Sequence, residues 1–347
     1  MAEHRIEISV KGRWITVPGL EVNGKTLIVR GGPVKMAVVH DEEWLETEIE
    51  DPELYVKQLK KQRSSGLRAD VFTFAQKLPA TLPKYGYATE WDSVAAIRLT
   101  TYKDWWEKLP QETRKNVRRS QKRGVSVTVK PFDESLVRAI GQVNDDSPVR
   151  QGVRNTHYGK SLDQLKKDYS SFLERSDFIC AYLEEEMIGF LKLVYRGEVA
   201  SLLNLTVKPS HHDKRSANAL MAKAVELCIA KGITNLIYGL FNYGNKGDNP
   251  LREFKVRNGF EEILVPRFFV PLTIWGALAV KLGLHRGLHG LLPRSVIAMG
   301  VAARAKWYYF KQSMGRCSSM TERPNRTRQT ECSNPPAGST SQGQGTI

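Results

Sequence analysis

The sequence predicts a mixed α/β protein in which helices flank a central sheet. Three observations predict it. First, strand-like segments at 178–183, 188–195 and 199–207 follow one another at hairpin spacing. Second, helical and strand patterns alternate from residue 216 onward. Third, the 347 residues are 41% hydrophobic and 26% charged, a globular balance that allows a large core. Hairpins followed by strand–helix alternation indicate a sheet with antiparallel and parallel parts.

The N-terminal elements are predicted by turn and capping signals. Residues 14–30 form a hairpin around Asn23-Gly24, a pair that favours a tight turn. Asp51-Pro52 begins a helix that Gly66 ends. Strands follow at 69–74 and 91–99.

The second half has its own order of elements. A helix opened by Pro110 ends at Gly124, and a strand follows it. The clearest helix is 216–231, where Leu220, Ala224, Leu227 and Cys228 share one face before Gly232. The order is completed by a strand at 235–241, a helix at 249–258 and a strand at 262–270.

We expect four parts in the chain. We expect an N-terminal lobe at 1–105, a second lobe at 106–272 and a helical cap at 273–312. The tail at 313–347 is rich in Ser, Thr, Pro, Gly and Gln, so it lacks the apolar residues needed for a core and is predicted to be disordered.

Charge and cysteine content limit the partners and the compartment. The net charge of +15 favours nucleic acid, an anionic membrane surface or phosphate-bearing small molecules. Four widely spaced cysteines match neither a zinc pattern nor a disulfide framework, so we expect no metal and a reducing, cytoplasmic compartment. No apolar signal core follows Met1–Val10, and the stretch Phe268–Val280 is too short to span a bilayer.

The stretch Leu202–Leu220 carries the most chemistry. A buried strand ends at Val207-Lys208-Pro209, and a short polar loop leads directly into a helix. Unpaired backbone N–H groups and the helix dipole make such a junction an anion site that suits a pyrophosphate. Lys214 and Arg215 add positive charge there.

This stretch resembles the acyl-donor motif of the GNAT superfamily of acyl-CoA transferases, Val-x-Pro followed by (Arg/Gln)-x-x-Gly-x-(Gly/Ala) and a helix. Val207, Pro209 and Ala217 match the motif. His212 stands where Arg or Gln is usual, and Arg215 stands where the central Gly is usual. Glycine lets a backbone approach a phosphate closely, so Arg215 is the larger departure.

Two further motifs resemble the FemAB-like branch of that superfamily, whose donor loops are also degenerate. That branch often carries a basic helix ending in Gly-Val ahead of its second domain, and a Phe-Lys pair near the last helix. Here the pair is Phe254-Lys255, and Lys255 holds the position before Gly259-Phe260 where GNAT enzymes often have a tyrosine. The basic helix residues are Arg114, Arg118, Arg119 and Lys122, before Gly124-Val125.

The resemblance implies an acyl-CoA N-acyltransferase fold of two related lobes, in which an amine attacks an activated acyl donor directly. It implies acetyl-CoA or another acyl-CoA as donor, and Lys255 as a catalytic residue that stabilises developing charge or a donor phosphate. The implied donor-binding residues are Leu205, Val207, His212, Lys214, Arg215, Ser216, Ala217 and Asn218.

The acceptor side is predicted from a loop of mixed aromatic, basic and Gly/Pro residues between 147 and 160. We expect Arg150, Gln151, Tyr158 and Asn242 to contact the acceptor. The strand at 202–207 has no carboxylate to act as general base, which leaves Asp213, Glu198 or a water molecule.

Three functions remain open from the sequence. The first is transfer of an acyl group, acetyl first, to an amino group of a sugar or cell-envelope precursor. The second uses aminoacyl-tRNA as donor, which the basic charge and the Arg114–Lys122 helix favour. The third is a non-catalytic scaffold.

Residues 275–309 form either a helical cap or a surface that contacts anionic lipid at the inner face of the membrane, and we favour the cap.

Overall fold

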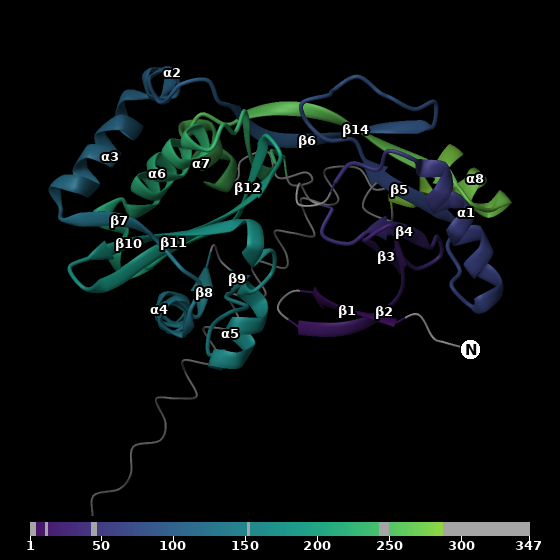
Figure 1. The fold of residues 1–347 in the computed structure, drawn as a ribbon, viewed down its shortest axis with the longest axis horizontal. Helices are drawn as coiled ribbons and strands as arrows, with labels where there is room; N and C mark the ends of the chain where they lie inside the picture. The colour runs from purple at the N-terminus through teal and green to yellow at the C-terminus, as the bar shows by residue number, and fades with distance from the viewer. Residues whose placement is uncertain (1–4, 11–12, 43–46, 151–152, 243–249, 287–347) are drawn as a thin grey trace, which may run out of the picture. The chain divides into compact units, whose positions relative to one another are not determined.

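The computed structural model describes residues 5–10, 13–42, 47–150, 153–242 and 250–286, all within one compact unit, Met1–Ala298. Its centre is a 12-stranded sheet with the order β1-β2-β3-β4-β5-β14-β6-β13-β12-β11-β10-β7 (Figure 1). The predicted mixed α/β class is confirmed, because hairpin-linked antiparallel strands share this sheet with the parallel pairs β4–β5 and β12–β13. The predicted tail and residues 287–312 of the predicted cap lie outside the described residues.

The N-terminal lobe follows the expected signals. β2 (Arg13–Val22) and β3 (Lys25–Arg30) form the hairpin around Asn23-Gly24. α1 (Pro52–Gln62) begins where the Asp51 side chain accepts the N–H of Leu54 at 3.2 Å. The remaining strands of this lobe are β1 (Arg5–Val10), β4 (Met36–Val39) and β5 (Val71–Ala75).

Two long strands join this lobe to the second. β6 (Ala88–Arg98) and β14 (Glu261–Pro271) pair with each other in register from Glu261↔Ala96 to Phe269↔Ala88. β14 then pairs with β5, and β6 with β13 (Asn235–Leu240). The sheet therefore runs through both predicted lobes without a break, and the boundary between residues 105 and 106 stays a prediction.

In the second lobe, helices cover both faces of the sheet. The predicted strands are β7 (Val125–Lys130), β10 (Ser176–Leu183), β11 (Glu186–Arg196) and β12 (Val199–Val207). One face packs against α2 (Tyr102–Lys108), α3 (Gln111–Lys122) and α6 (Ser216–Ala230). The other packs against α4 (Glu134–Asp145) and α5 (Leu162–Tyr169), two helices that the sequence analysis did not assign. α7 (Pro250–Arg257) and α8 (Ile274–Lys281) flank β14 in sequence.

Candidate functional site

The central feature of the site is the place where β12 and β13 part. These parallel strands pair only from Val199↔Asn235 to Ser201↔Ile237. Burial of the side chains changes at the same place. Ala200–Leu202 and Asn235–Ile237 are buried, whereas the residues that follow on each strand are half-buried or exposed. Beyond this pairing, no described strand pairs with the facing edges of Leu203–Val207 and Tyr238–Leu240, so backbone groups on these edges are suited to bind an extended ligand.

A bulge in β12 lies at the start of this separation. Lys192 of β11 opposes Asn204, and Leu193 opposes Leu202, so Leu203 is the extra residue. Its side chain is 37% exposed. A bulge bends the strand that carries it, which explains why β12 turns away from β13 at this point.

The donor loop, residues 208–215, connects β12 to α6. It contains a turn of 3₁₀ helix (Pro209–Lys214) and ends at Arg215, whose φ of 57° and ψ of 29° are left-handed. Glycine adopts this conformation without strain, so the geometry explains why glycine is usual here in the motif that the loop resembles. Because arginine has no acceptor atom, its side chain does not cap the first turn of α6. The positive end of the helix dipole therefore faces the loop.

Charged contacts hold the donor loop to α3. The guanidinium of Arg123 donates to the backbone carbonyl of Asp213 and lies 3.7 Å from its carboxylate. Lys214 lies 3.4 Å from the same carboxylate. The Asp213 carboxylate is thus flanked by two cations, and the exposed His212 and Arg215 remain at the outer surface of the loop.

A cavity of about 370 Å³ opens beside this loop. It brings together the start of α6, the N-terminal half of α3 and the outer face of α7. The lining residues are Pro110, Glu112, Thr113, Asn116, Arg215, Asn218, Pro250, Glu253, Phe254, Arg257 and Asn258.

Lys255 lies at the parted end of β13 and is fully buried. Its Nζ donates to the carbonyl oxygen of Leu240 at 2.6 Å and stands 4.7 Å from the centre of the Tyr238 ring. Burial away from water disfavours the charged form and lowers the pKa of Lys255 to about 8. The predicted catalytic residue is therefore next to the strand separation, and it is not the exposed helix lysine that is more common.

The predicted donor-binding residues gather on one continuous segment. Leu205 and Val207 lie on the half-buried end of β12. Ser216, Ala217 and Asn218 form the first turn of α6, with Ser216 buried. The Asn218 amide donates to the side-chain oxygen of Asn258 at 3.4 Å, which links this turn to the end of α7.

The predicted acceptor residues are not all brought together. Tyr158 is 45% exposed in a tight loop, where the Asp145 carboxylate accepts the N–H of Gly159 at 2.8 Å. Asn242 instead bonds Glu262 at 2.8 Å, on the β6–β14 side of β13. Arg150 ends β8 (Val149–Arg150), its side chain is not described, and Gln151 lies outside the described residues.

Sequence reasoning missed two polar contacts of this region. Asp146, directly after α4, accepts the N–H of Ser210 at 3.0 Å and its hydroxyl at 2.7 Å. His157 lies 3.2 Å from the carboxylate of Asp168, a buried group that also contacts Lys160. The sequence analysis did not assign α4, so it had no local signal for Asp146, and the partner of His157 is set only by the docking of α5.

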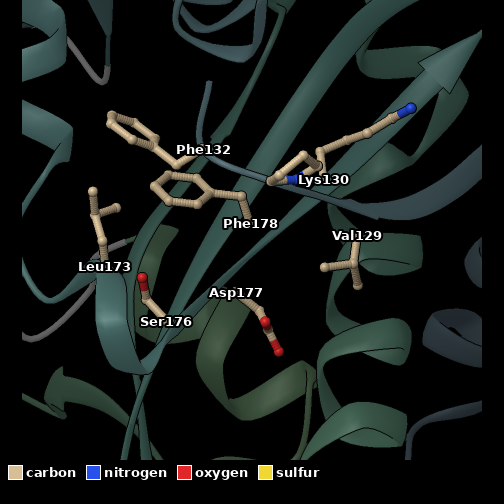
Figure 2. Close-up of a pocket in the computed structure, with 8 residues that line it drawn as sticks. Val129, Lys130, Phe132, Leu173, Ser176, Asp177 and Phe178 are labelled. Carbon is tan, nitrogen blue, oxygen red and sulfur yellow. The ribbon is translucent and has the colours of Figure 1, made fainter. Parts of the chain in front are cut away.

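A second cavity, of about 380 Å³, lies at the far edge of the sheet, between the end of β7 and the start of β10 (Figure 2). Phe132 and Phe178 stack on its wall with ring centres 5.1 Å apart. The Asp177 carboxylate beside it accepts the hydroxyl of Tyr195 at 2.9 Å. None of the predicted site residues lines this cavity.

Comparison with known proteins identifies a domain of known family. Residues 146–249 match the family model described as the acetyltransferase (GNAT) family. This segment contains β12, the donor loop, α6 and β13, and a domain of this family makes the chain an N-acyltransferase. No curated protein matches the chain.

Solved structures resemble this fold at low sequence identity. The crystal structure of FemX is 11% identical, covers 80% of this chain and 90% of its own, and has a TM-score of 0.51. The C-terminal domain of a lysylphosphatidylglycerol synthetase from Agrobacterium fabrum is 15% identical, with 76% and 87% covered and a TM-score of 0.48. L-PGS from Bacillus licheniformis is 14% identical, covers 77% of this chain and 88% of its own, and has a TM-score of 0.48. At this identity the FemX likeness shows the fold, which agrees with a FemAB-like GNAT architecture.

Proposed function

We propose that this protein moves an acyl group from acyl-CoA to an amino group of a sugar or cell-envelope precursor. Its residues 146–249 match the GNAT acetyltransferase family. Acetyl-CoA is the first donor to test. The observation that carries the proposal is the parting of β12 and β13 directly before the donor loop.

The parted strands suit the extended arm of coenzyme A. Its amide groups would pair with the open backbone of β12 at Leu203–Val207, as an added strand would. The pyrophosphate would then reach the start of α6, where helix N–H groups, Lys214 and Arg215 favour an anion. The cavity beside Arg215 and Asn218 has room for the rest of the donor.

The reaction would proceed by direct attack. The acceptor nitrogen forms a bond to the thioester carbon, the carbon–sulfur bond breaks, and the amine proton passes to a base or to water. Backbone N–H groups of β12 would stabilise the oxyanion. The Lys255 ammonium, next to Leu240 on the opposing strand, would stabilise the leaving thiolate or a donor phosphate.

Calorimetric titration with acetyl-CoA tests the donor site. Arg215→Glu places a negative charge at the start of α6 and should weaken binding at least about tenfold by repelling the pyrophosphate. Arg63→Glu, at an exposed arginine of the first lobe, is the matched control and should bind as the wild type does. If the folded protein binds no acyl-CoA, the proposal is wrong. If it binds acetyl-CoA, a screen of amino sugars as acceptors follows.

A second candidate donor is aminoacyl-tRNA, favoured by the basic surface of α3. Arg118 and Lys122 lie on this helix beside Arg123, which contacts the donor loop. Binding of tRNA would release counterions and fall steeply with added salt. Aminoacyl transfer from charged tRNA, with no transfer from acetyl-CoA, would favour this donor over the first.

We place the reaction in the cytoplasm, as the cysteines suggest. Cys180 and Cys228 are free and buried, and burial raises the pKa of each to about 12, so neither is a reactive thiolate. Fractionation of cells that express the full chain tests the compartment.

A further inference from the structure

The outer face of α8 is apolar. The Thr273 hydroxyl caps the helix by accepting the N–H of Gly276 at 2.8 Å. The inner face packs Ala279 against Val71 and Phe269 of the sheet. The outward-facing apolar side chains are Ile274, 92% exposed, Trp275, 42%, Leu278, 46%, and Leu282, just beyond the helix, 56%.

This composition is unusual for a surface helix. α1, in the same lobe, buries Tyr55 and Leu59 and presents lysines such as Lys57 and Lys60 outward. In α8, residues 274, 278 and 282 repeat at the i, i+4, i+8 spacing of one helix face, yet that face points away from the core. A helix that is apolar on all sides is normally covered in the working protein.

Exposed cations lie on the segments that border this face. Trp275 donates its indole N–H to the carbonyl of Pro33 at 3.0 Å, which places the helix start beside the segment of Lys35. The carboxylate of Asp70 accepts the N–H of Lys35 at 2.9 Å and lies 3.2 Å from the Thr273 hydroxyl. The exposed cations of these segments are Lys35, Arg68, Lys281 and Arg286.

The carboxylates nearest to α8 are already engaged. Asp70 is held by the contacts to Lys35 and Thr273. Glu90 contacts His285 at 2.6 Å and Arg286 at 2.8 Å. The four exposed cations of these segments, of which Arg286 is paired with Glu90, outnumber these two carboxylates, so the border of the apolar face has a net positive charge.

We propose that the outer face of α8 docks the protein onto the surface of an anionic lipid bilayer. Ile274, Leu278 and Leu282 would enter the boundary between headgroups and acyl chains, with Trp275 at headgroup level. The bordering cations would face lipid phosphates, and each adds attraction within a Debye length of the surface. No described helix is long and apolar enough to cross a membrane. This docking is independent of the proposed acyl donor.

Charge favours a bilayer over the other occupants. A second copy docked through the same face would bring two positive borders together. The segment 287–347 is also basic: it holds eight Lys or Arg and two Glu, a net charge of +6. An anionic bilayer offers acyl chains to the apolar face and phosphate groups to the cations.

Vesicle sedimentation of the full chain tests this docking. We expect binding to vesicles of phosphatidylcholine with phosphatidylglycerol, and little binding to phosphatidylcholine alone. Ile274→Ser with Leu278→Ser should reduce the partition coefficient about tenfold, since apolar area no longer leaves water. Arg68→Glu with Lys281→Glu should weaken binding at low salt. Leu173→Ser, at a residue 38% exposed in the second lobe, is the matched control and should bind unchanged.

Three outcomes would overturn the docking. The wild type stays unbound at low salt, the apolar double variant binds as the wild type does, or that variant abolishes self-association of a chain that binds no vesicles. Circular dichroism checks that each variant is folded. Acetyl-CoA titration of the apolar double variant should match the wild type, which separates this surface from the donor site.

Discussion

Ser210 donates both its backbone N–H and its hydroxyl to the carboxylate of Asp146, at 3.0 and 2.7 Å. Asp146 directly precedes the predicted acceptor loop at 147–160, and Ser210 belongs to the donor loop. One carboxylate therefore connects the two segments that the proposed reaction needs to hold in a fixed relation.

Asp146→Asn should loosen this connection. Burial by itself would raise the pKa of Asp146, but the two bonds from Ser210 hold it below its ordinary value. A carboxyl with a lowered pKa stabilises the fold above its unfolded pKa, and that stability is lost as the pH falls through the folded pKa. In thermal unfolding, the free energy of unfolding of the wild type should therefore exceed that of the variant by roughly 1 kcal/mol near pH 7, and this difference should disappear in acid. An equal difference at every pH would contradict this account.

Arg215→Gly and Arg215→Ala separate backbone strain from charge. Both remove the guanidinium, but only glycine adopts the φ of 57° without strain. The glycine variant should therefore be more stable than the alanine variant by about 1 kcal/mol. Denaturant unfolding of the two measures it, and equal stabilities would mean that the loop rearranges.

Lys255→Met should lower kcat by about 10² or more while the fold is retained, if the ammonium stabilises charge in the transition state. Because the pKa of Lys255 is lowered to about 8, the wild-type rate should fall as the pH rises past that value. The remaining activity of the variant should lack this limb of the pH profile. Lys60→Met, at an exposed lysine of α1 in the first lobe, is the control and should keep the wild-type rate.

Lys192 provides a stability test away from the donor loop. It is fully buried on β11, donates to the carbonyl of Tyr169 at 2.8 Å, and has a pKa lowered to about 8 by burial. The unfolded chain therefore binds one more proton between about pH 8 and its ordinary value of 10.5, so this group favours folding more as the pH rises through that window.

Comparison with Lys192→Met isolates this contribution. As the pH rises across this window, the free energy of unfolding of the wild type should increase relative to that of the variant by on the order of 1 kcal/mol. Denaturant unfolding at a series of pH values measures it, and a difference that stays constant with pH would show that Lys192 titrates as it does in water.

Local elements were largely predictable because their signals lie within a few residues. The Asn23-Gly24 hairpin, the Asp51 cap and the helix at 216–231 all appear in the structure. α4 carries the helical spacing Leu136, Ile140 and Val143 but was not assigned, since a short apolar run between loops is ambiguous without its partner surface.

Strand neighbours were not predictable. β14 lies between β5 and β6, although nearly 190 residues separate it in sequence from β5. Such pairing depends on which edges become adjacent when the chain folds, and no local pattern encodes it.

The sequence by itself determined the donor loop: its strand end, its helix start, its cations and the arginine at the glycine position. Tertiary structure alone decided where β12 and β13 separate, that Lys255 is buried beside Leu240, and that Asp146 reaches Ser210. The reason is physical. A side chain's identity is local, but its desolvation and its partners depend on every segment packed around it.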